Sequence, residues 1–170
     1  MKSLVKTAFI VIITAFLFTN NSMAQQTAKQ IKQAARQAVI KKDIETKNYT
    51  FLADYALPQR GGQRYLSPGY DLRVVADSVI AYLPYFGQVY MDPPLNPDDA
   101  GIKFTSTKFN YTTEQKKKGG WSILISPSDA KQTAKLRLEV SVDGYATLMV
   151  TSNNRDMISF NGYIKQREAK

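Results

Sequence analysis

The sequence contains no cysteine and no histidine. Without cysteine, the chain can form no disulfide, thiolate metal site or thiol nucleophile, and it can carry no lipid on an N-terminal cysteine. Histidine is the commonest general base and the commonest zinc ligand, so its absence excludes Ser-His-Asp hydrolysis and histidine-based metallohydrolysis. We therefore expect a non-catalytic protein without a metal ion or another cofactor.

Acidic residues are also in the minority, with 14 Asp and Glu against 23 Lys and Arg, which gives a net charge of +9. Such a surplus can attract nucleic acid, anionic lipid or acidic polysaccharide. The basic residues are scattered along the chain, and they are not gathered with interleaved aromatic residues. The charge pattern therefore indicates general surface charge, and we expect no nucleic-acid partner.

The chain has only one long apolar run, Thr7 to Phe18, and it lies close to the N-terminus. Lys2 and Lys6 precede this run, and the small residues of Ser22-Met23-Ala24 follow it, which is the pattern of a signal peptide. An uncleaved membrane anchor is the alternative, but a span needs about 20 apolar residues. We expect a signal peptide to be cleaved before Gln25.

Cleavage would remove residues 1–24, leaving 146 residues that fit a single domain. Two of the 23 basic residues and no acidic residue lie in the signal, so the net charge would fall from +9 to +7. The mature protein should be soluble in the periplasm or outside the cell, as a monomer or weak oligomer.

The mature chain is expected to begin with a helix over residues 25–47, with its periodicity clearest from Gln26 to Lys47. Apolar residues recur there near a period of 3.6, and lysine and arginine occupy the other side. A basic amphipathic helix can lie on a membrane surface. This one is rich in alanine and lacks Trp, Phe and Leu, so we expect no stable membrane insertion and favour packing across a sheet or barrel mouth.

From Asn48 onward the hydrophobic period changes to two, which predicts β-strands. Residues 48–165 are expected to form a small antiparallel β-barrel of about eight strands, followed by a charged tail over 166–170. Asp143-Gly144 is the strongest hairpin signal in the chain. A closed barrel is favoured because it leaves no strand edge exposed. The expected strands are Tyr49–Ala56, Asp71–Ala76 with a light break at Asp77-Ser78 before it resumes over Val79–Leu83, Gln88–Met91, Ile102–Thr113, Trp121–Ser126, Ala134–Val142, Tyr145–Thr151 and Met157–Ile164.

Several segments together resemble the DUF4251 family of exported Bacteroidetes proteins. They are Tyr82-Leu83-Pro84-Tyr85-Phe86-Gly87, Gly101-Ile102-Lys103-Phe104, Gly120-Trp121, Gly144-Tyr145-Ala146 and Ser159-Phe160-Asn161-Gly162. The resemblance covers nearly all of the mature chain. It implies a barrel of lipocalin-like (calycin) shape with a helix before it, and it implies no activity.

The segment from Tyr82 to Gly87 combines a proline, a glycine and three aromatic residues. One interpretation is a pocket mouth, in which Tyr82, Tyr85 and Phe86, together with Trp121, bind a small apolar or amphipathic ligand in the barrel. The other is a strand kink whose aromatic side chains plug the barrel. An envelope partner that binds the outer surface and the basic helix is the alternative to a small ligand.

Two further sites can be considered from carboxylates and amides alone. Asp92, Asn96, Asp98 and Asp99 offer oxygen ligands, but they lack the spacing of a calcium loop, so a surface loop is favoured. A glycan hydrolase would need two carboxylates, from among Asp54, Asp71 and Glu139, within about 5–10 Å of each other. Nothing in their spacing brings two of them together.

Overall fold

A computed structural model of the chain describes residues 28–91, 101–117, 119–130 and 133–167. The chain divides into two compact units, residues 1–38 and 39–170. The predicted signal peptide, the acidic residues of the 92–100 loop and the last three tail residues lie outside the described part. The predictions for them stay predictions.

The described residues of the first unit, 28–38, are helical and largely exposed. In the second unit, helical residues continue to position 45, where Ile40 and Ile44 are buried. The helix ends in a Schellman arrangement, because Lys47 adopts a φ of 52° and the Asn48 amide donates to the Asp43 carbonyl over 2.9 Å. The N-terminal helix expected from the sequence is confirmed over these described residues.

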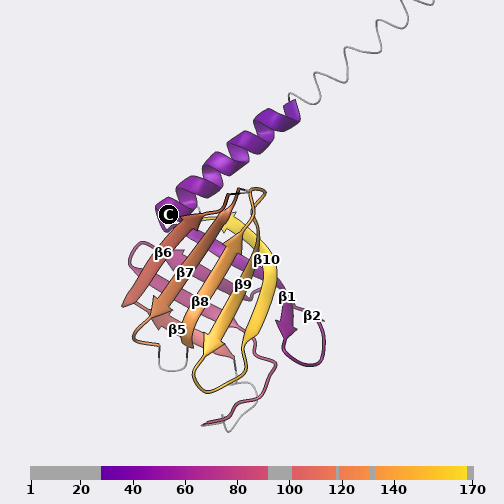
Figure 1. Cartoon of the computed structure of the whole chain (residues 1–170), viewed down its shortest axis with the longest axis vertical. Helices are drawn as coiled ribbons and strands as arrows, with labels where there is room; N and C mark the ends of the chain where they lie inside the picture. The colour runs from indigo at the N-terminus through magenta and orange to yellow at the C-terminus, as the bar shows by residue number, and fades with distance from the viewer. Residues whose placement is uncertain (1–27, 92–100, 118, 131–132, 168–170) are drawn as a thin grey trace, which may run out of the picture. The chain divides into compact units, whose positions relative to one another are not determined.

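The second unit is an antiparallel sheet of ten strands that curls into a nearly closed barrel. The strand order is β5-β4-β3-β1-β10-β9-β8-β7-β6, with β2 paired to β1 beside this path. Strands β6 to β10 lie side by side in Figure 1, and β5 crosses behind them. The bounds are β1 (Tyr49–Pro58), β2 (Arg64–Tyr65), β3 (Asp71–Val75), β4 (Ser78–Leu83), β5 (Ile102–Ser106), β6 (Phe109–Gln115), β7 (Trp121–Pro127), β8 (Thr133–Val140), β9 (Tyr145–Ser152) and β10 (Ile158–Gln166).

The predicted fold class, a mainly β chain with an antiparallel barrel and one helix, is confirmed, and the Asp143-Gly144 hairpin joins β8 to β9. Three details differ. The short strand β2 was not expected. The predicted strand over 88–91 makes only an isolated bridge between Val89 and Arg155. The single strand expected over 102–113 is two strands, and in the described residues no ladder joins β5 to β6, so the hydrogen bonding of the barrel is open there.

The break between β5 and β6 is a corner held by one carboxylate. Asp129 accepts hydrogen bonds from the Ser106 hydroxyl and from the amides of Thr107, over 3.0 Å, and Lys108, over 3.2 Å. These three donors lie at the point where the chain leaves one end of the sheet path and enters the other. Because Asp129 lies 21 residues or more further along the chain, periodicity within 102–113 could not reveal the corner.

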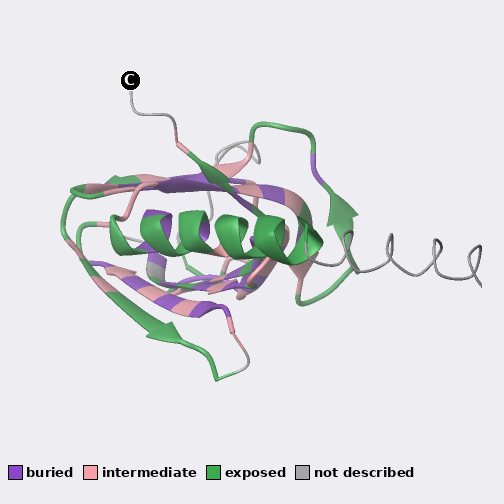
Figure 2. Ribbon diagram, turned by 90° about the horizontal axis from the view of Figure 1, so that it is seen from above, coloured by how far each residue is buried: buried purple, intermediate pink, exposed green. Residues whose placement is uncertain are grey.

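Buried and less buried residues alternate along several strands, as the colours of the ribbon in Figure 2 show. The burial of β7 alternates at every residue from Trp121 to Pro127. Large side chains with less than 2 % exposure form the centre of the core, namely Tyr49, Phe51, Leu72, Leu83, Ile123, Ile125, Leu136, Leu138, Leu148, Ile158 and Phe160. These side chains belong to one hydrophobic core cluster of the described residues. The small ligand expected inside the barrel stays a prediction.

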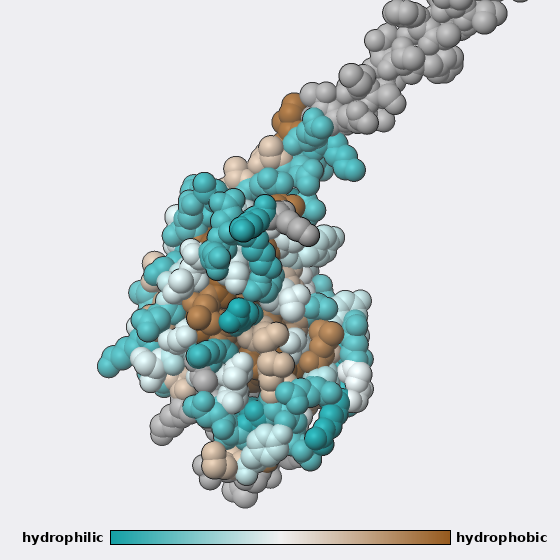
Figure 3. All heavy atoms as spheres, in the orientation of Figure 1, coloured by the Kyte–Doolittle hydropathy of each residue, from teal (hydrophilic) through white to brown (hydrophobic). Residues whose placement is uncertain are grey.

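The outer surface is of mixed polarity. On the face seen in Figure 3, hydrophilic side chains cover most of the area and apolar ones gather only in small separate places. Within the described ranges, no helix has the length and apolar character needed to cross a membrane.

Candidate functional site

The four residues predicted to bind a ligand do not form one site. Tyr82, Tyr85 and Phe86 line a common pocket of about 360 Å³ beside Tyr70. Trp121 does not line it. It begins β7, pairs with Val140 of β8 and is buried in the core.

Tyr85 has a structural part in this region. Its hydroxyl lies 2.9 Å from the Gln88 carbonyl and 3.0 Å from the Asp156 carbonyl, and the Arg155 guanidinium lies 4.8 Å from its ring. Burial, followed by the charge of Asp156, raises the pKa of Tyr85 to about 12. A Cβ added at Gly87 would lie 2.5 Å from the Tyr85 hydroxyl, so a larger residue there would displace the Tyr85 side chain.

The strap, as we name residues 84–91, is therefore fastened to residues 154–156. Its backbone bonds run from the Tyr90 amide to the Asn154 carbonyl over 2.7 Å and from the Asp156 amide to the Gln88 carbonyl over 3.0 Å. Tyr85 thus ties the strap to Asp156 and also lines the pocket with Tyr82 and Phe86.

The other two predicted aromatic residues are also engaged. The Arg64 guanidinium lies 4.8 Å from the Phe86 ring. Tyr82 stacks on Tyr70, with 5.7 Å between ring centroids and 16° between planes, and the Lys103 ammonium lies 5.6 Å from the Tyr82 ring. Tyr82 keeps 44 % of its surface exposed, the largest share among the four predicted residues.

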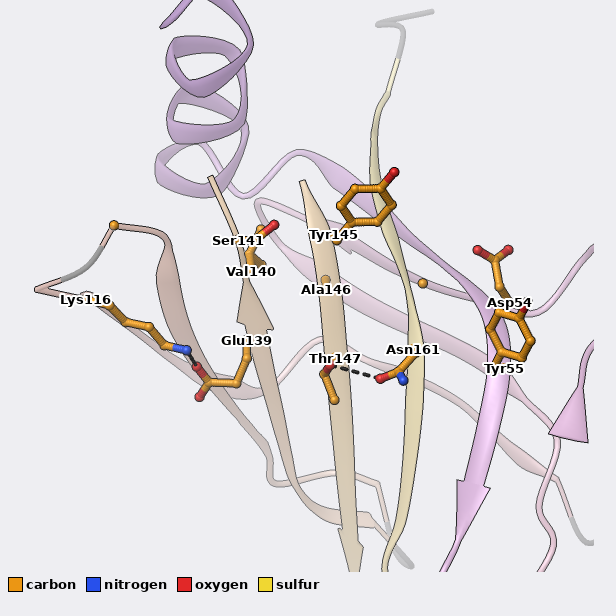
Figure 4. Close-up of a pocket in the computed structure, with 12 residues that line it drawn as sticks. Asp54, Tyr55, Lys116, Glu139, Val140, Ser141, Tyr145, Ala146, Thr147 and Asn161 are labelled. Atoms are coloured by element: carbon orange, nitrogen blue, oxygen red, sulfur yellow. Dashed lines mark hydrogen bonds and ion pairs between the residues drawn. The ribbon is translucent and has the colours of Figure 1, made fainter. Parts of the chain in front are cut away.

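A larger hollow, about 580 Å³, lies on the outer face of the sheet across β8, β9, β10 and β1. We call it the outer groove. Its lining residues are Asp54, Tyr55, Lys116, Gly119, Glu139, Val140, Ser141, Tyr145, Ala146, Thr147, Asn161 and Gly162, and Figure 4 shows how the labelled ones lie.

One wall of the outer groove is a row of side chains set by the strand register. Glu139 lies opposite Thr147, Thr147 opposite Asn161, and Asn161 opposite Tyr55. The Thr147 hydroxyl donates to the Asn161 side-chain oxygen over 2.9 Å, as the dashed line in Figure 4 marks. Because strands lie about 4.8 Å apart, the row spans three spacings, or roughly 14 Å.

The opposite wall contains Ser141 and Tyr145 from the β8–β9 hairpin. Tyr145 is 68 % exposed, and its carbonyl accepts a bond of 2.8 Å from the Ser141 amide. Between the walls, Ala146 pairs with Gly162, and both residues line the groove although Ala146 belongs to the buried core.

A bulge in β1 shapes the far end of the outer groove. The register with β10 shifts between Ala53 and Tyr55, which makes Asp54 the extra residue. Gly162 lies so close beneath that a Cβ there would come within 1.8 Å of the Leu52 carbonyl oxygen. Only glycine permits this approach of β10 to the bulge.

The near end of the outer groove carries an ion pair between Lys116 and Glu139. The Ser122 hydroxyl also donates to Glu139, over 2.7 Å. Burial alone would raise the pKa of Glu139, but the hydrogen bonds from Lys116 and Ser122 and the charges of Lys116 and Arg137 outweigh burial and lower it. Glu139 is therefore held as a carboxylate.

The carboxylates considered for hydrolysis are far apart in the sheet. Asp54 and Glu139 share the outer groove, but they lie on β1 and β8, three strand spacings apart. Asp71 lies on β3 and its carboxylate is 3.4 Å from Arg73. In the part of the chain that the structure describes, no three acidic residues gather where they could hold a metal ion.

The family model "Domain of unknown function (DUF4251)" matches residues 31–164. The chain belongs to the DUF4251 family. A crystal structure of a DUF4251 family protein from Bacteroides eggerthii DSM 20697 has a similar fold, with a TM-score of 0.57 and 15 % identity over 79 % of this chain and 91 % of that one. No curated protein matches the chain.

The segments on which the DUF4251 resemblance rests supply part of the outer groove. Tyr145 and Ala146 come from one of them, and Asn161 and Gly162 from another. The sequence analysis gave these residues no binding role, because they are separated along the chain and meet only through strand pairing. The alternation of polar residues in β9 and β10 was a signal for an outward face, but it did not reveal which faces share a row.

Proposed function

We propose that this DUF4251 protein is an exported, non-catalytic binding module whose ligand site is the outer groove. The observation that carries the proposal is the row Glu139–Thr147–Asn161–Tyr55, which places three hydrogen-bonding side chains and one aromatic ring side by side on four strands. Pockets that combine a few convergent polar groups with aromatic walls are the common form of a binding site.

The packing of the barrel supports this position for the site. The side chains of the hydrophobic core are only 0–8 % exposed, which favours a ligand site on the outside. The Tyr85 hydroxyl in the strap is already engaged in hydrogen bonds within the protein. Tyr145 in the outer groove is largely exposed and is therefore available to a ligand.

Two observations support a binding role over a catalytic one. The chain has no histidine and no cysteine, the usual bases and nucleophiles. The two carboxylates of the outer groove lie on strands roughly 14 Å apart, beyond the separation of about 5–10 Å that glycosidase pairs use.

Ligand-induced thermal stabilisation tests this proposal. Mature protein would be heated alone and with three probe classes: uncharged oligosaccharides, short peptides and fatty acids. A ligand that binds only the folded state raises the Tm. We expect at least one class to raise the Tm of the unmodified protein and to lose this effect in Tyr145→Ala.

Tyr82→Ala is the matched control, because Tyr82 is also an exposed tyrosine on the sheet but does not line the outer groove. Equal stabilisation of both variants, or no stabilisation by any class, would contradict the proposal. If the protein instead binds an envelope partner through its outer surface, none of the three probe classes should stabilise it.

The export part of the proposal has its own test. N-terminal sequencing of protein recovered outside the cytoplasm should begin at Gln25. Recovery of membrane-bound protein that still begins at Met1 would contradict cleavage.

A further inference from the structure

We infer that the ligand of the outer groove is an uncharged carbohydrate chain that lies across the strands. This inference rests on the proposed function and names the class of ligand. Four features carry it: the hydrogen-bonding groups of the wall, the two exposed rings, the pairing on both sides of the four strands under the groove, and the balance of charge.

The wall offers both donors and acceptors to a ligand rich in hydroxyl groups. Since the Thr147 hydroxyl donates to the Asn161 side-chain oxygen, the Asn161 amide nitrogen remains a donor and the Thr147 oxygen remains an acceptor. At the far end, the structure shows no hydrogen bond or ion pair of the Asp54 carboxylate with another described residue, so this carboxylate can accept from a hydroxyl. Each sugar hydroxyl can both donate and accept a hydrogen bond. A surface that offers donors and acceptors side by side can pair with both functions.

Two tyrosine rings stand at the walls of the same hollow. Tyr145 is 68 % exposed and Tyr55 is 37 % exposed. Tyr55 is braced by an edge contact with Tyr65, with 5.4 Å between ring centroids and 72° between planes. An aromatic face packs against the C–H face of a sugar ring, while the tyrosine hydroxyl stays in water. Figure 4 shows the two labelled rings on the side of the outer groove away from the Lys116–Glu139 pair.

The strands under the outer groove cannot recruit a peptide by extending the sheet. β8, β9, β10 and β1 each have a hydrogen-bonded neighbour on both sides, so their backbone groups are already paired. Addition of a peptide strand requires a free edge. A ligand here must be recognised by side chains. A carbohydrate fits this requirement because its hydroxyl groups can bind to polar side chains and need no free backbone edge.

The charge in the outer groove disfavours an acidic ligand. Its charged lining residues are Asp54, Glu139 and Lys116, and the last two form an ion pair. The lining thus carries one more negative than positive charge, although the whole chain is basic. A polyanion would meet Asp54 unfavourably, whereas an uncharged chain would not.

Affinity electrophoresis of the mature protein tests the inference. Native gels would contain, one at a time, soluble uncharged polysaccharides: an α-glucan, a β-glucan, a mannan and a xylan. We expect at least one to retard the protein, with binding weakened roughly tenfold by Tyr145→Ala or Asn161→Ala, the order of magnitude of one lost ring or hydrogen bond.

Two conservative variants separate binding from folding. Tyr145→Phe keeps the ring and should bind almost as the unmodified protein does, and Tyr82→Ala lies outside the outer groove and should bind equally well. Circular dichroism would check that all variants are folded.

The outcomes distinguish this inference from the proposed function. If no polysaccharide retards the protein while peptides or fatty acids stabilise it through the outer groove, the carbohydrate class is wrong and the binding module stands. If none of the three classes binds, both are wrong. Retardation that Tyr145→Ala and Asn161→Ala leave unchanged would also overturn the inference.

Discussion

At the scale of single residues, two tyrosines connect the end of the helix to the barrel. The hydroxyls of Tyr49 and Tyr111 lie 3.1 Å apart, and Tyr111 donates to the Ile44 carbonyl over 3.1 Å. Tyr49 is fully buried, and burial, followed by the charge and hydrogen bond of Tyr111, raises its pKa well above the ordinary value. Burial also raises the pKa of Tyr111, to about 12.

Replacing the outer member of this pair should cost more stability than replacing the inner one. Tyr111→Phe leaves the buried Tyr49 hydroxyl without its acceptor and should lower the free energy of unfolding by about 1–3 kcal/mol. Tyr49→Phe removes the buried hydroxyl itself, and Tyr111 can still donate to Ile44, so a loss of about 0.5–1.5 kcal/mol is expected. Urea denaturation measures both; a larger loss for Tyr49→Phe would contradict this arrangement.

Gly162 is the residue on which the bulged end of the outer groove depends. Gly162→Ala would place a Cβ within 1.8 Å of the Leu52 carbonyl and should destabilise the fold by about 1–3 kcal/mol or more, because backbone must move. Gly62→Ala is the comparison: its Cβ would meet nothing within 4 Å, so only the strain of its φ of 75° remains, which costs about 1–2 kcal/mol. Thermal unfolding should show the larger loss at Gly162, and equal losses would refute the close approach.

At the scale of elements, the corner between β5 and β6 and the strap are both held by aspartates. The hydrogen bond from Ser106, followed by those from the Thr107 and Lys108 amides, lowers the pKa of Asp129 in spite of desolvation. Hydrogen bonding by Tyr90 lowers the pKa of Asp156 in the same way. Each group binds a proton less readily in the folded chain than in the unfolded chain.

This direction predicts that acid weakens the fold. A lowered folded pKa contributes stability that is present above the unfolded pKa, about 3.9, and is lost as the pH falls toward the folded value. Denaturation at pH 7 and pH 3 should show a smaller difference for Asp129→Asn than for the unmodified protein. An unchanged difference would mean that Asp129 does not hold the corner as a carboxylate.

The strap should become less stable when Tyr85 loses its hydroxyl. Tyr85→Phe removes the donor to the Gln88 and Asp156 carbonyls, so the Tyr90 and Asp156 amides should exchange with deuterium faster. The amides of β7 serve as the internal control, because β7 pairs with β6 and β8 and lies far along the chain from residues 154–156. Uniform acceleration across the protein, or none at all, would contradict a local role.

The elements also show how far the sequence predicted the fold. Residue alternation located most strands, and the 3.6-residue period located the helix, because each pattern is local. The β5–β6 corner, the strap and the row Glu139–Thr147–Asn161–Tyr55 depend on partners far along the chain. The aromatic cluster of the LPYFG segment was visible in the sequence, but its hydrogen bonds were not.

At the scale of the whole molecule, the packed core and the outer groove together favour the proposal that a ligand binds on the outside of the barrel. The core side chains are buried, and the outer face offers a polar row and exposed tyrosines. The predicted lack of catalysis and the proposed export fit a module that carries a ligand without transforming it.

Chemical-shift mapping tests this central claim most directly. Isotope-labelled mature protein would be titrated with an uncharged oligosaccharide taken from the polysaccharide that retards it most. The proposal predicts that the largest shifts fall on the amides of Thr147, Asn161 and Tyr55 along the row, with little change at Tyr82. Shifts that centre on the core residues Leu148 and Phe160, or on the strap, would contradict it.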